Sequence, residues 1–511
     1  MKIIIRKGSR SMINGIRNFI GWVGKKMVIA AENNQNLTDK QYIERKITNW
    51  LISSTRLNQL QGEAYYRGVH DILFKKRMII GEDGKLVEAK NLPHNQKVDN
   101  QYAKMVDQKK NYLLGQPISF DCDDKKYVEA LKKVFNKKFQ KILKDMGEEC
   151  LNGGIAWVCP YYNESGELKF KKFPAYEILP FWNDVAHTEL NIAVRMYEVE
   201  KPNAINEKDT IKKVEIYTKS GIDYFTFENN RLIPEVAKPH ENYITVTTGD
   251  KVQDYNWDRI PLVPFKRNAK ETPLINNCKS LQDAINDIIS MFKNNMEEDA
   301  RNTILVLENY DGTNLGEFRK NLSQYGVVKV RSGDGARGDV RTLTVEVNSA
   351  NYEAILKIFK KALIENCKGY DFSELRTGGS PNQMNIKSIY SDIDLDANDM
   401  ETEFQASFED LLWFVNQYLN VGQDVEEKDV EIVFNRDGVV NETEIMQMLV
   451  SAGVKISNRT LLAQVPFIDS IDDEIKQVKE EEQEQIDAYG GSLAMNGGNN
   501  DNLQNNKQNK Q

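Results

Sequence analysis

The glycine-rich segment Gly333–Gly338 is the first stretch of the chain that could do chemistry. It reads Gly-Asp-Gly-Ala-Arg-Gly, which matches the GxGxxG pattern of dinucleotide-binding loops. That pattern holds a pyrophosphate only where a strand precedes it and a helix follows, because the helix N-terminus supplies the N–H groups. The preceding VVKV is strand-like, but the following DVRTLTVEV also predicts a strand. We therefore predict a hairpin turn here and no cofactor.

An acidic run between residues 392 and 403 is the best candidate for a metal site. Oxygen ligands occur at five positions of an EF-hand-like calcium loop, namely Asp392, Asp394, Asp396, Asn398 and Glu403. The sixth position of such a loop requires Gly for a sharp turn, whereas this chain has Ala397. The segment also continues a helical apolar pattern without a break. We predict acids on a helix surface and no bound metal, with a calcium site as the minor alternative.

Other residue types that carry enzyme chemistry are scattered. The four histidines, at 70, 94, 187 and 240, show neither HxH nor HExxH spacing, so a zinc site or a histidine dyad has no local support. The chain has no GxxxxGK[ST] phosphate loop and no GxSxG nucleophile elbow. Its five cysteines form no CxxC pair, which is typical of reduced thiols in a cytosolic product. We predict that the protein is not an enzyme.

Charge is low overall and uneven along the chain. The 511 residues carry a net charge of −8, which disfavours a protein that grips nucleic acid with its whole surface. Residues 1–31 nevertheless carry +7, residues 104–144 carry +6 and residues 422–487 carry −11. For residues 104–144 we favour a solvated helix face over a phosphate-facing patch, and both interpretations stay open. No run of 18 apolar residues occurs, so we expect no membrane-spanning helix.

Hydrophobic periodicity indicates the elements that position these residues. The capping box Thr38-Asp39-Lys40-Gln41 predicts a helix through Trp50 to Leu60, and a second helical stretch begins near Lys97. Short β-branched and aromatic runs predict a strand-rich region from 155 to 265. Beyond it we expect a helix at 276–299, a compact mixed segment, a helix at 348–367, a glycine-rich loop at 368–380 and a long helix at 381–421.

The two ends of the chain are expected to lie outside the core. Residues 1–37 form a basic arm with apolar residues at helical spacing. We expect this arm to pack on a neighbouring subunit or to stay mobile, in preference to lying on a membrane surface. Residues 488–511 are rich in Asn, Gln and Gly, so we predict a disordered tail.

Three pairs of segments, in consistent order along the chain, carry a resemblance to a known family. The first pair is YYRGVHDI with NLPHNQKVDNQYAKMVDQKKNYLLGQPI, the second is IPLVPFKRN with EEDARNTILVLENYDG, and the third is KSIYSDIDLDANDMETEF with VEIVFNRDGVVNETEI. Together they span residues 40 to 470, approximately. They resemble the portal proteins of tailed double-stranded DNA bacteriophages, in the branch typical of long-tailed siphophages.

The resemblance implies an α+β, mostly helical portal fold with wing, stem, clip and crown regions, assembled as a ring. The wing is expected at 38–265, a stem helix at 266–300, the clip at 301–347 and the second stem helix at 348–367. The tunnel loop would follow at 368–380, the long wing helix at 381–421 and the crown at 422–487.

The implied function is a ring of about twelve subunits at one capsid vertex, the conduit for double-stranded DNA during packaging and ejection. The implied partners are the terminase, head-completion and connector proteins, and capsid and scaffolding proteins, with no membrane partner. The protein would be assembled in the host cytoplasm and would reside in the virion. The alternatives are a DNA-processing enzyme of a phage packaging system and a calcium-binding adaptor.

The tunnel loop is the expected contact with DNA. A channel that lets DNA slide must not bind it tightly, because each neutralised phosphate deepens the binding. Small and polar loop residues with few cations are suited to such weak contact. The expected set is Lys368, Ser373, Arg376, Thr377, Gly378, Gly379 and Ser380. The alternative is a solvent loop that touches nothing.

Overall fold

The computed structural model describes residues 40–80, 84–89, 92–200, 210–248, 251–299, 304–308, 332–333, 336–337, 339–343, 349–371, 383–423, 427–436 and 474–481. The chain divides into two units, residues 1–372 with 389–438 and residues 373–388 with 439–511. In the second unit the structure describes the start of helix α11 and a short helix at 474–481. The predicted arm at 1–37 and the tail at 488–511 lie outside the described residues, as does most of the 422–487 segment.

The region before residue 155 is mainly helical. Its helices are α2 (Lys40–Leu51), α3 (Ser54–Tyr66), α4 (Gln101–Leu114), α5 (Lys125–Val134) and α6 (Lys137–Gly153). The prediction of one helix through to Leu60 is wrong, because the chain breaks at Ser53. This residue is extended and its side chain accepts a hydrogen bond from the Arg56 N–H at 3.2 Å, which starts a new helix.

Helices α3 and α6 approach each other closely at Gly62. A Cβ atom at this position would lie 2.1 Å from the carbonyl oxygen of Asn152. Only glycine therefore permits the contact, because the obstructing atom belongs to the backbone and cannot rotate away. The side chain of Asn152 accepts a hydrogen bond from the Tyr102 hydroxyl at 2.9 Å, which joins α4 to the same junction.

The strand-rich prediction for residues 155–265 is confirmed. One antiparallel sheet has the order β10-β9-β8-β7-β6, and β11 also pairs with β9. Its strands are β6 (Ile178–Trp182), β7 (Leu190–Glu200), β8 (Thr210–Thr218), β9 (Gly221–Glu228), β10 (Arg231–Pro234) and β11 (His240–Glu241). A second sheet has the order β14-β4-β5, from Val263–Lys266, Ile155–Tyr162 and Leu168–Phe173. Two-stranded hairpins join β1 (Met78–Ile80) to β2 (Leu86–Glu88) and β12 (Ile244–Thr248) to β13 (Lys251–Tyr255).

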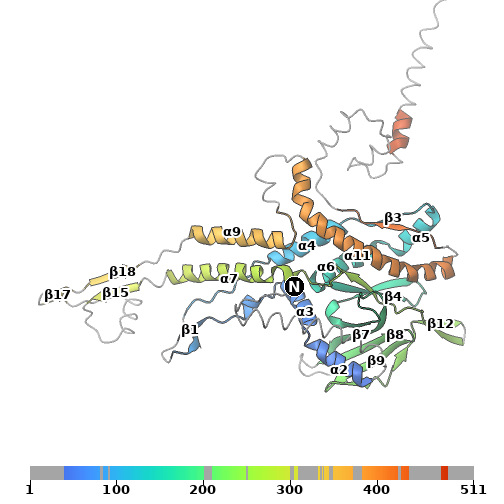
Figure 1. Cartoon of the computed structure of the whole chain (residues 1–511), viewed down its shortest axis with the longest axis horizontal. Helices are drawn as coiled ribbons and strands as arrows, with labels where there is room; N and C mark the ends of the chain where they lie inside the picture. The colour runs from blue at the N-terminus through green and yellow to red at the C-terminus, as the bar shows by residue number, and fades with distance from the viewer. Residues whose placement is uncertain are drawn as a thin grey trace, which may run out of the picture. The chain divides into compact units, whose positions relative to one another are not determined.

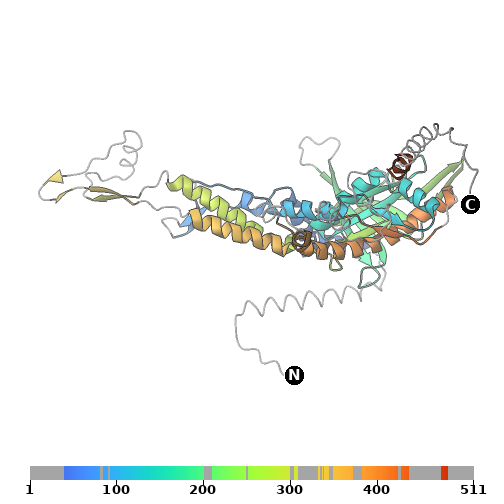
Figure 2. The ribbon, with the colours of Figure 1, turned by 90° about the horizontal axis from the view of Figure 1, so that it is seen from above.

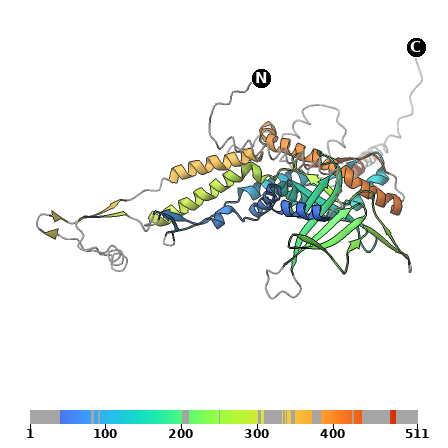
Figure 3. The same ribbon diagram turned by 60° about the horizontal axis from the view of Figure 1, so that its bottom comes forward.

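The largest sheet forms a core with helix α2. Ile43, Ile47 and Trp50 on one face of the helix pack in one cluster with Val194 and Ile216 of the sheet (Figure 3). The three helical residues are spaced at i, i+4 and i+7, so a single apolar stripe covers the strands.

Helices α7 (Ile275–Asp299) and α9 (Ser349–Asn366) lie side by side (Figure 2). The rings of Phe292 and Tyr352 are 5.0 Å apart, and the Tyr352 hydroxyl accepts a hydrogen bond from the Asn295 side chain at 2.9 Å. In the part of the sequence between α7 and α9, β15 (Ile304–Glu308) pairs antiparallel with β18 (Asp339–Leu343).

The segment that matches GxGxxG belongs to a hairpin, as predicted. Strands β16 (Ser332–Gly333) and β17 (Ala336–Arg337) pair antiparallel, and the next element is strand β18 (Figure 1). The described residues of this segment, 332–333, 336–337 and 339–343, all lie in strands, so none of them forms the helix N-terminus that a dinucleotide-binding loop requires.

The long helix predicted at 381–421 is confirmed as α11 (Gln383–Gln423), a helix of 41 residues. Its buried face includes Ile393, Phe404, Phe408 and Val415. Phe408 meets the rings of Phe135 and Phe139 from the α5–α6 region at 5.8 and 6.0 Å. Strand β19 (Glu431–Val433) then pairs antiparallel with β3 (Ser119–Asp121).

Candidate functional site

Lys368 is the member of the expected tunnel-loop set that the structure describes. It follows α9 with a φ of 51°, and its backbone N–H donates to the carbonyl oxygen of Glu365 at 2.9 Å. Its ammonium group lies 3.6 Å from a carboxylate oxygen of Asp396 and 3.8 Å from one of Asp399. The rest of the set, Ser373, Arg376, Thr377, Gly378, Gly379 and Ser380, lies outside the described residues.

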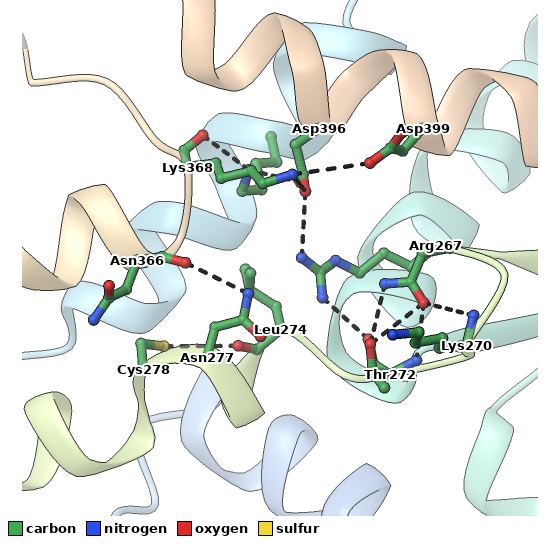
Figure 4. Close-up of polar contacts among 12 residues, drawn as sticks. Arg267, Lys270, Thr272, Leu274, Asn277, Cys278, Asn366, Lys368, Asp396 and Asp399 are labelled. Atoms are coloured by element: carbon green, nitrogen blue, oxygen red, sulfur yellow. Dashed lines mark hydrogen bonds and ion pairs between the residues drawn. The ribbon is translucent and has the colours of Figure 1, made fainter. Parts of the chain in front are cut away.

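Asp396 on α11 is the meeting point of four segments (Figure 4). Lys109 of α4 donates to its Oδ2 at 2.8 Å, and Arg267 lies 3.5 Å from its Oδ1 at the end of β14. The Lys109 ammonium also donates to the carbonyl oxygen of Lys368 at 3.1 Å. We call Lys109, Arg267, Lys368, Asp396 and Asp399 the Asp396 centre. It ties α4, the β14–α7 connection and the end of α9 to α11.

The charged side chains of the Asp396 centre that lie deepest are largely shielded from solvent, which changes their pKa values. The side chains of Lys109, Arg267 and Asp396 are 4%, 5% and 15% exposed. Burial by itself raises the pKa of the Asp396 carboxyl, but Lys109 and Arg267 outweigh burial and hold that pKa below its usual value. Burial lowers the pKa of the Lys109 ammonium despite the opposing effect of Asp396. Each buried charge therefore depends on the others, and removing one leaves the rest uncompensated.

The N-terminal end of α7 and the C-terminal end of α9 contact each other next to the Asp396 centre, through a hydrogen bond and through two thiols. Asn277 of α7 donates to the carbonyl oxygen of Asn366 at 3.4 Å (Figure 4). The Cys278 thiol is buried and interacts with the buried thiol of Cys367, and this contact together with burial raises the pKa of Cys278. All five cysteines are free thiols, as the sequence predicted.

The acidic run considered as a calcium site lies within α11, so the prediction of a helix is confirmed. The expectation that these acids lie on a helix surface is wrong for Asp396, which is only 15% exposed and lies among buried cations. Asp394 accepts a hydrogen bond from the Tyr112 hydroxyl and pairs with Arg436 at 2.9 Å. Asp392 and Glu403 share the helix with them. Among the described residues, no group of three or more His, Cys, Asp or Glu side chains is arranged to hold a metal ion.

Helix α7 carries a row of buried polar side chains that sequence reasoning missed. Gln282, Asn286, Ser290 and Asn294 recur every four residues and are 0–9% exposed. They accept hydrogen bonds from the backbone N–H groups of Tyr102, Asp99, Lys97 and Asn95, at 2.9, 3.0, 2.9 and 2.7 Å. We call this set the α7 ladder. It explains why helix α4 begins at Gln101 and not near Lys97 as predicted.

His70 completes the α7 ladder. Its ring stacks on Tyr65 with centroids 4.3 Å apart, and its Nδ1 lies 2.8 Å from the Asn286 side chain. Burial lowers the pKa of His70, so a neutral ring is favoured at this position. His70 is therefore a buried, hydrogen-bonded histidine. The recurrence of Gln, Asn and Ser at i, i+4 spacing along this amphipathic helix was the signal that could have revealed the contact.

No helix in the described part of the chain is long and apolar enough to cross a membrane. The mixed helices and antiparallel sheets, the α7–α9 pair and the 41-residue α11 agree with the α+β class expected from the sequence.

Comparison with known proteins gives the class to which this fold belongs. The chain belongs to the family of SPP1 Gp6-like phage portal proteins, whose family model matches residues 45–488. It is 29% identical over 461 residues to the portal protein of Bacillus phage SPP1, across 86% of this chain and 87% of that protein. It is 25% identical over 440 residues to the portal protein of Clostridium phage phiCD119, across 84% of this chain and 93% of that protein.

The family resemblance inferred from sequence is therefore confirmed. Portal proteins of this family are structural, non-enzymatic components of the virion that serve capsid assembly and DNA packaging. The prediction that the chain is not an enzyme is confirmed with it.

Proposed function

We propose that the chain assembles in about twelve copies into a closed ring at one capsid vertex and forms the conduit for double-stranded DNA. Terminase would dock on this ring during packaging, and head-completion and connector proteins would replace it afterwards. Capsid and scaffolding proteins would surround the ring in the assembling particle. The observation that carries the proposal is the family match over residues 45–488.

The regions of the chain receive roles within this proposal. Residues 38–265 and 381–421 would form the wing, and residues 266–300 and 348–367, which contain α7 and α9, would form the stem. Residues 301–347 would form the clip, and residues 422–487 the crown. The α7–α9 pair supports the stem assignment, because two packed helices of 25 and 18 residues provide a rigid pillar.

Sizing of the purified full-length chain tests the ring. Light scattering with negative-stain imaging should report closed rings of about twelve times the 58.7 kDa chain mass. A clean monomer under assembly conditions would overturn the proposal.

The tunnel loop at residues 368–380 is proposed to line the narrowest part of the channel. Gly378→Leu with Gly379→Leu should leave rings intact and reduce the amount of DNA packaged, because bulky residues would obstruct the path. The matched control is Ser165→Leu, in an exposed turn of the strand region. If particles carrying the double variant package the full length of DNA, the loop does not line the narrowest part of the channel.

A further inference from the structure

Helices α5 and α6 expose a dense set of lysines, which we call the lysine face. Its members are Lys125, Lys126, Lys132, Lys133, Lys137, Lys138 and Lys141. Glu129 is the acid within the same stretch. The opposite face of the two helices is buried through Tyr127, Leu131 and Phe139. The lysines therefore occupy the solvent side of a well-packed helix pair and have no role in the core.

These lysines are not used within the molecule. In the part of the chain that the structure describes, none of the seven ammonium groups forms an ion pair or a hydrogen bond. Lysines elsewhere are commonly paired, as Lys110 is with Glu148 at 2.7 Å and Lys279 with Asp71 at 2.6 Å. The lysine face thus holds positive charge without ion-pair partners in a chain whose net charge is −8. Its members act on the described acids only weakly, as where Lys169 lowers the pKa of Glu167 and Lys138 adds a smaller effect.

The placement of four of the seven lysines costs helix stability. Cations near a helix N-terminus oppose the helix dipole, and Lys125, Lys126, Lys137 and Lys138 lie in the first turns of α5 and α6. Neither helix has an acid in its first turn. The terminal N–H groups are already satisfied by the capping side chains of Asp124 and Asn136. Helix stability therefore does not account for these lysines, which leaves an external anion as their partner.

We propose that the lysine face binds the phosphate backbone of double-stranded DNA without sequence preference. Lysine is depleted in protein–protein interfaces, whereas large apolar and aromatic side chains are favoured there. Among the described residues from 92 to 184, no large apolar side chain is exposed, so a protein partner is disfavoured. The face has no Arg, and the side-chain amides of Asn136 and Gln140 in the same stretch donate to the backbone carbonyl oxygens of Lys133 and Gln116 at 3.2 and 3.1 Å. Clustered lysines suit phosphate contacts, which carry no sequence information.

The proposal depends on the proposed function only for the presence of DNA around the ring. It concerns residues of α5 and α6, none of which belongs to the expected tunnel-loop set. For residues 104–144 the sequence left a solvated helix face and a phosphate-facing patch open, and the proposal adopts the second for these exposed lysines. A channel must release DNA, whereas a surface outside the channel has no such restriction.

Fluorescence anisotropy with a short labelled duplex of random sequence tests the proposal on the assembled full-length chain. The test variant replaces Lys125, Lys126, Lys137 and Lys138 with Gln. The control variant replaces four exposed lysines elsewhere with Gln, namely Lys219, Lys270, Lys357 and Lys479. Its net charge therefore equals that of the test variant. The basic segment at 1–31 is present in both variants, so the difference between them reports on α5 and α6.

We expect the test variant to lose at least about tenfold in affinity, and its slope of log K against log salt between about 50 and 200 mM to decrease by roughly 3. Control affinity should stay within about twofold of wild type, and Lys→Arg at the four test positions should restore binding. Equal loss in test and control variants, or no loss in either, would overturn the proposal.

Two further readouts separate this proposal from others. If the test variant loses binding to poly-glutamate and keeps its affinity for DNA, the face belongs to an acidic protein segment and the proposal is wrong. Light scattering on the same samples should show unchanged rings in both variants. A wild-type chain that binds DNA through these lysines but forms no ring would contradict the proposed function alone.

Discussion

The Asp396 centre and the lysine face both gather positive charge, but only the first compensates it internally. Around Asp396, three cations converge on two carboxylates from four segments, and the innermost side chains are almost fully buried. On α5 and α6, seven cations point into solvent with one acid among them. Charge inside this fold therefore holds elements in position, whereas charge left unpaired on its surface is available for a partner.

The largest expected loss of stability follows from removing the counter-charge of the buried cations in the Asp396 centre. Asp396→Ala should destabilise the chain by about 3–5 kcal/mol, because Lys109 and Arg267 are left buried without a counter-charge. Denaturant unfolding followed by circular dichroism measures this change. Asp399→Ala is the control, since its side chain is 67% exposed and its removal should change stability by no more than about 0.5 kcal/mol. Equal effects of the two variants would mean that compensation at Asp396 is unimportant.

A smaller effect is expected where buried groups are neutral. Asn286→Ala removes the acceptor for the Asp99 N–H and the partner of His70. It should destabilise the chain by about 1–3 kcal/mol, the cost of leaving such groups unsatisfied. Asn277→Ala is the control, because Asn277 is exposed and its one contact is long, at 3.4 Å. If Asn286→Ala costs as much as Asp396→Ala, charge is not what distinguishes the Asp396 centre.

Acid should weaken the Asp396 centre selectively. Because the folded-state pKa of Asp396 is held below its usual value, its carboxylate contributes stability above the unfolded-state pKa. This contribution is lost as pH falls from the unfolded-state pKa through the folded-state pKa. The difference in unfolding free energy between wild type and Asp396→Asn should therefore narrow from pH 7 toward pH 3, as measured by urea unfolding. A difference that is independent of pH would contradict the ionised pairing.

The smallest effect is expected at the lysine face. Replacing Lys125, Lys126, Lys137 and Lys138 with Gln should leave stability unchanged or raise it by about 0.3–1 kcal/mol, because cations leave the positive ends of two helix dipoles. Thermal unfolding of the variant and of the wild type shows whether stability rises or falls. Gln at Lys132 and Lys133, in the last turn of α5, should instead lower stability slightly. A clear loss of stability at the first four positions would assign them a structural role.

Local patterns predicted the elements better than they predicted the sites. The apolar spacing predicted α11 at 381–421, and the observed bounds are Gln383–Gln423. Alternation predicted the strand region and the hairpin at Gly333. The break at Ser53 was missed, because a single capping side chain decides it. These outcomes depend on neighbours along the chain, which the sequence displays directly.

The Asp396 centre could not be predicted from spacing. Lys109, Arg267 and Lys368 are far from Asp396 in the sequence, and nothing in their local context distinguishes them from solvent-exposed cations. The acids of α11 suggested a calcium site because their spacing matches a ligand pattern. That spacing carries no information on the cations from other segments that pack against them. The α7 ladder was visible in part, because its polar residues share the i, i+4 period.

The α7 ladder has a consequence for how this helix can move. Its acceptors are four residues apart, about 6 Å along a helix, and the donors at Asn95, Lys97 and Asp99 are two residues apart, about 6.6 Å along an extended chain. The two spacings nearly match. Sliding α7 by one full repeat would bring most donors opposite a new acceptor, whereas sliding by half a repeat would leave all of them without one. Any axial shift of α7 by less than a full four-residue repeat would therefore leave backbone N–H groups of residues 95–99 without acceptors, and the cost of these unpaired groups resists such a shift.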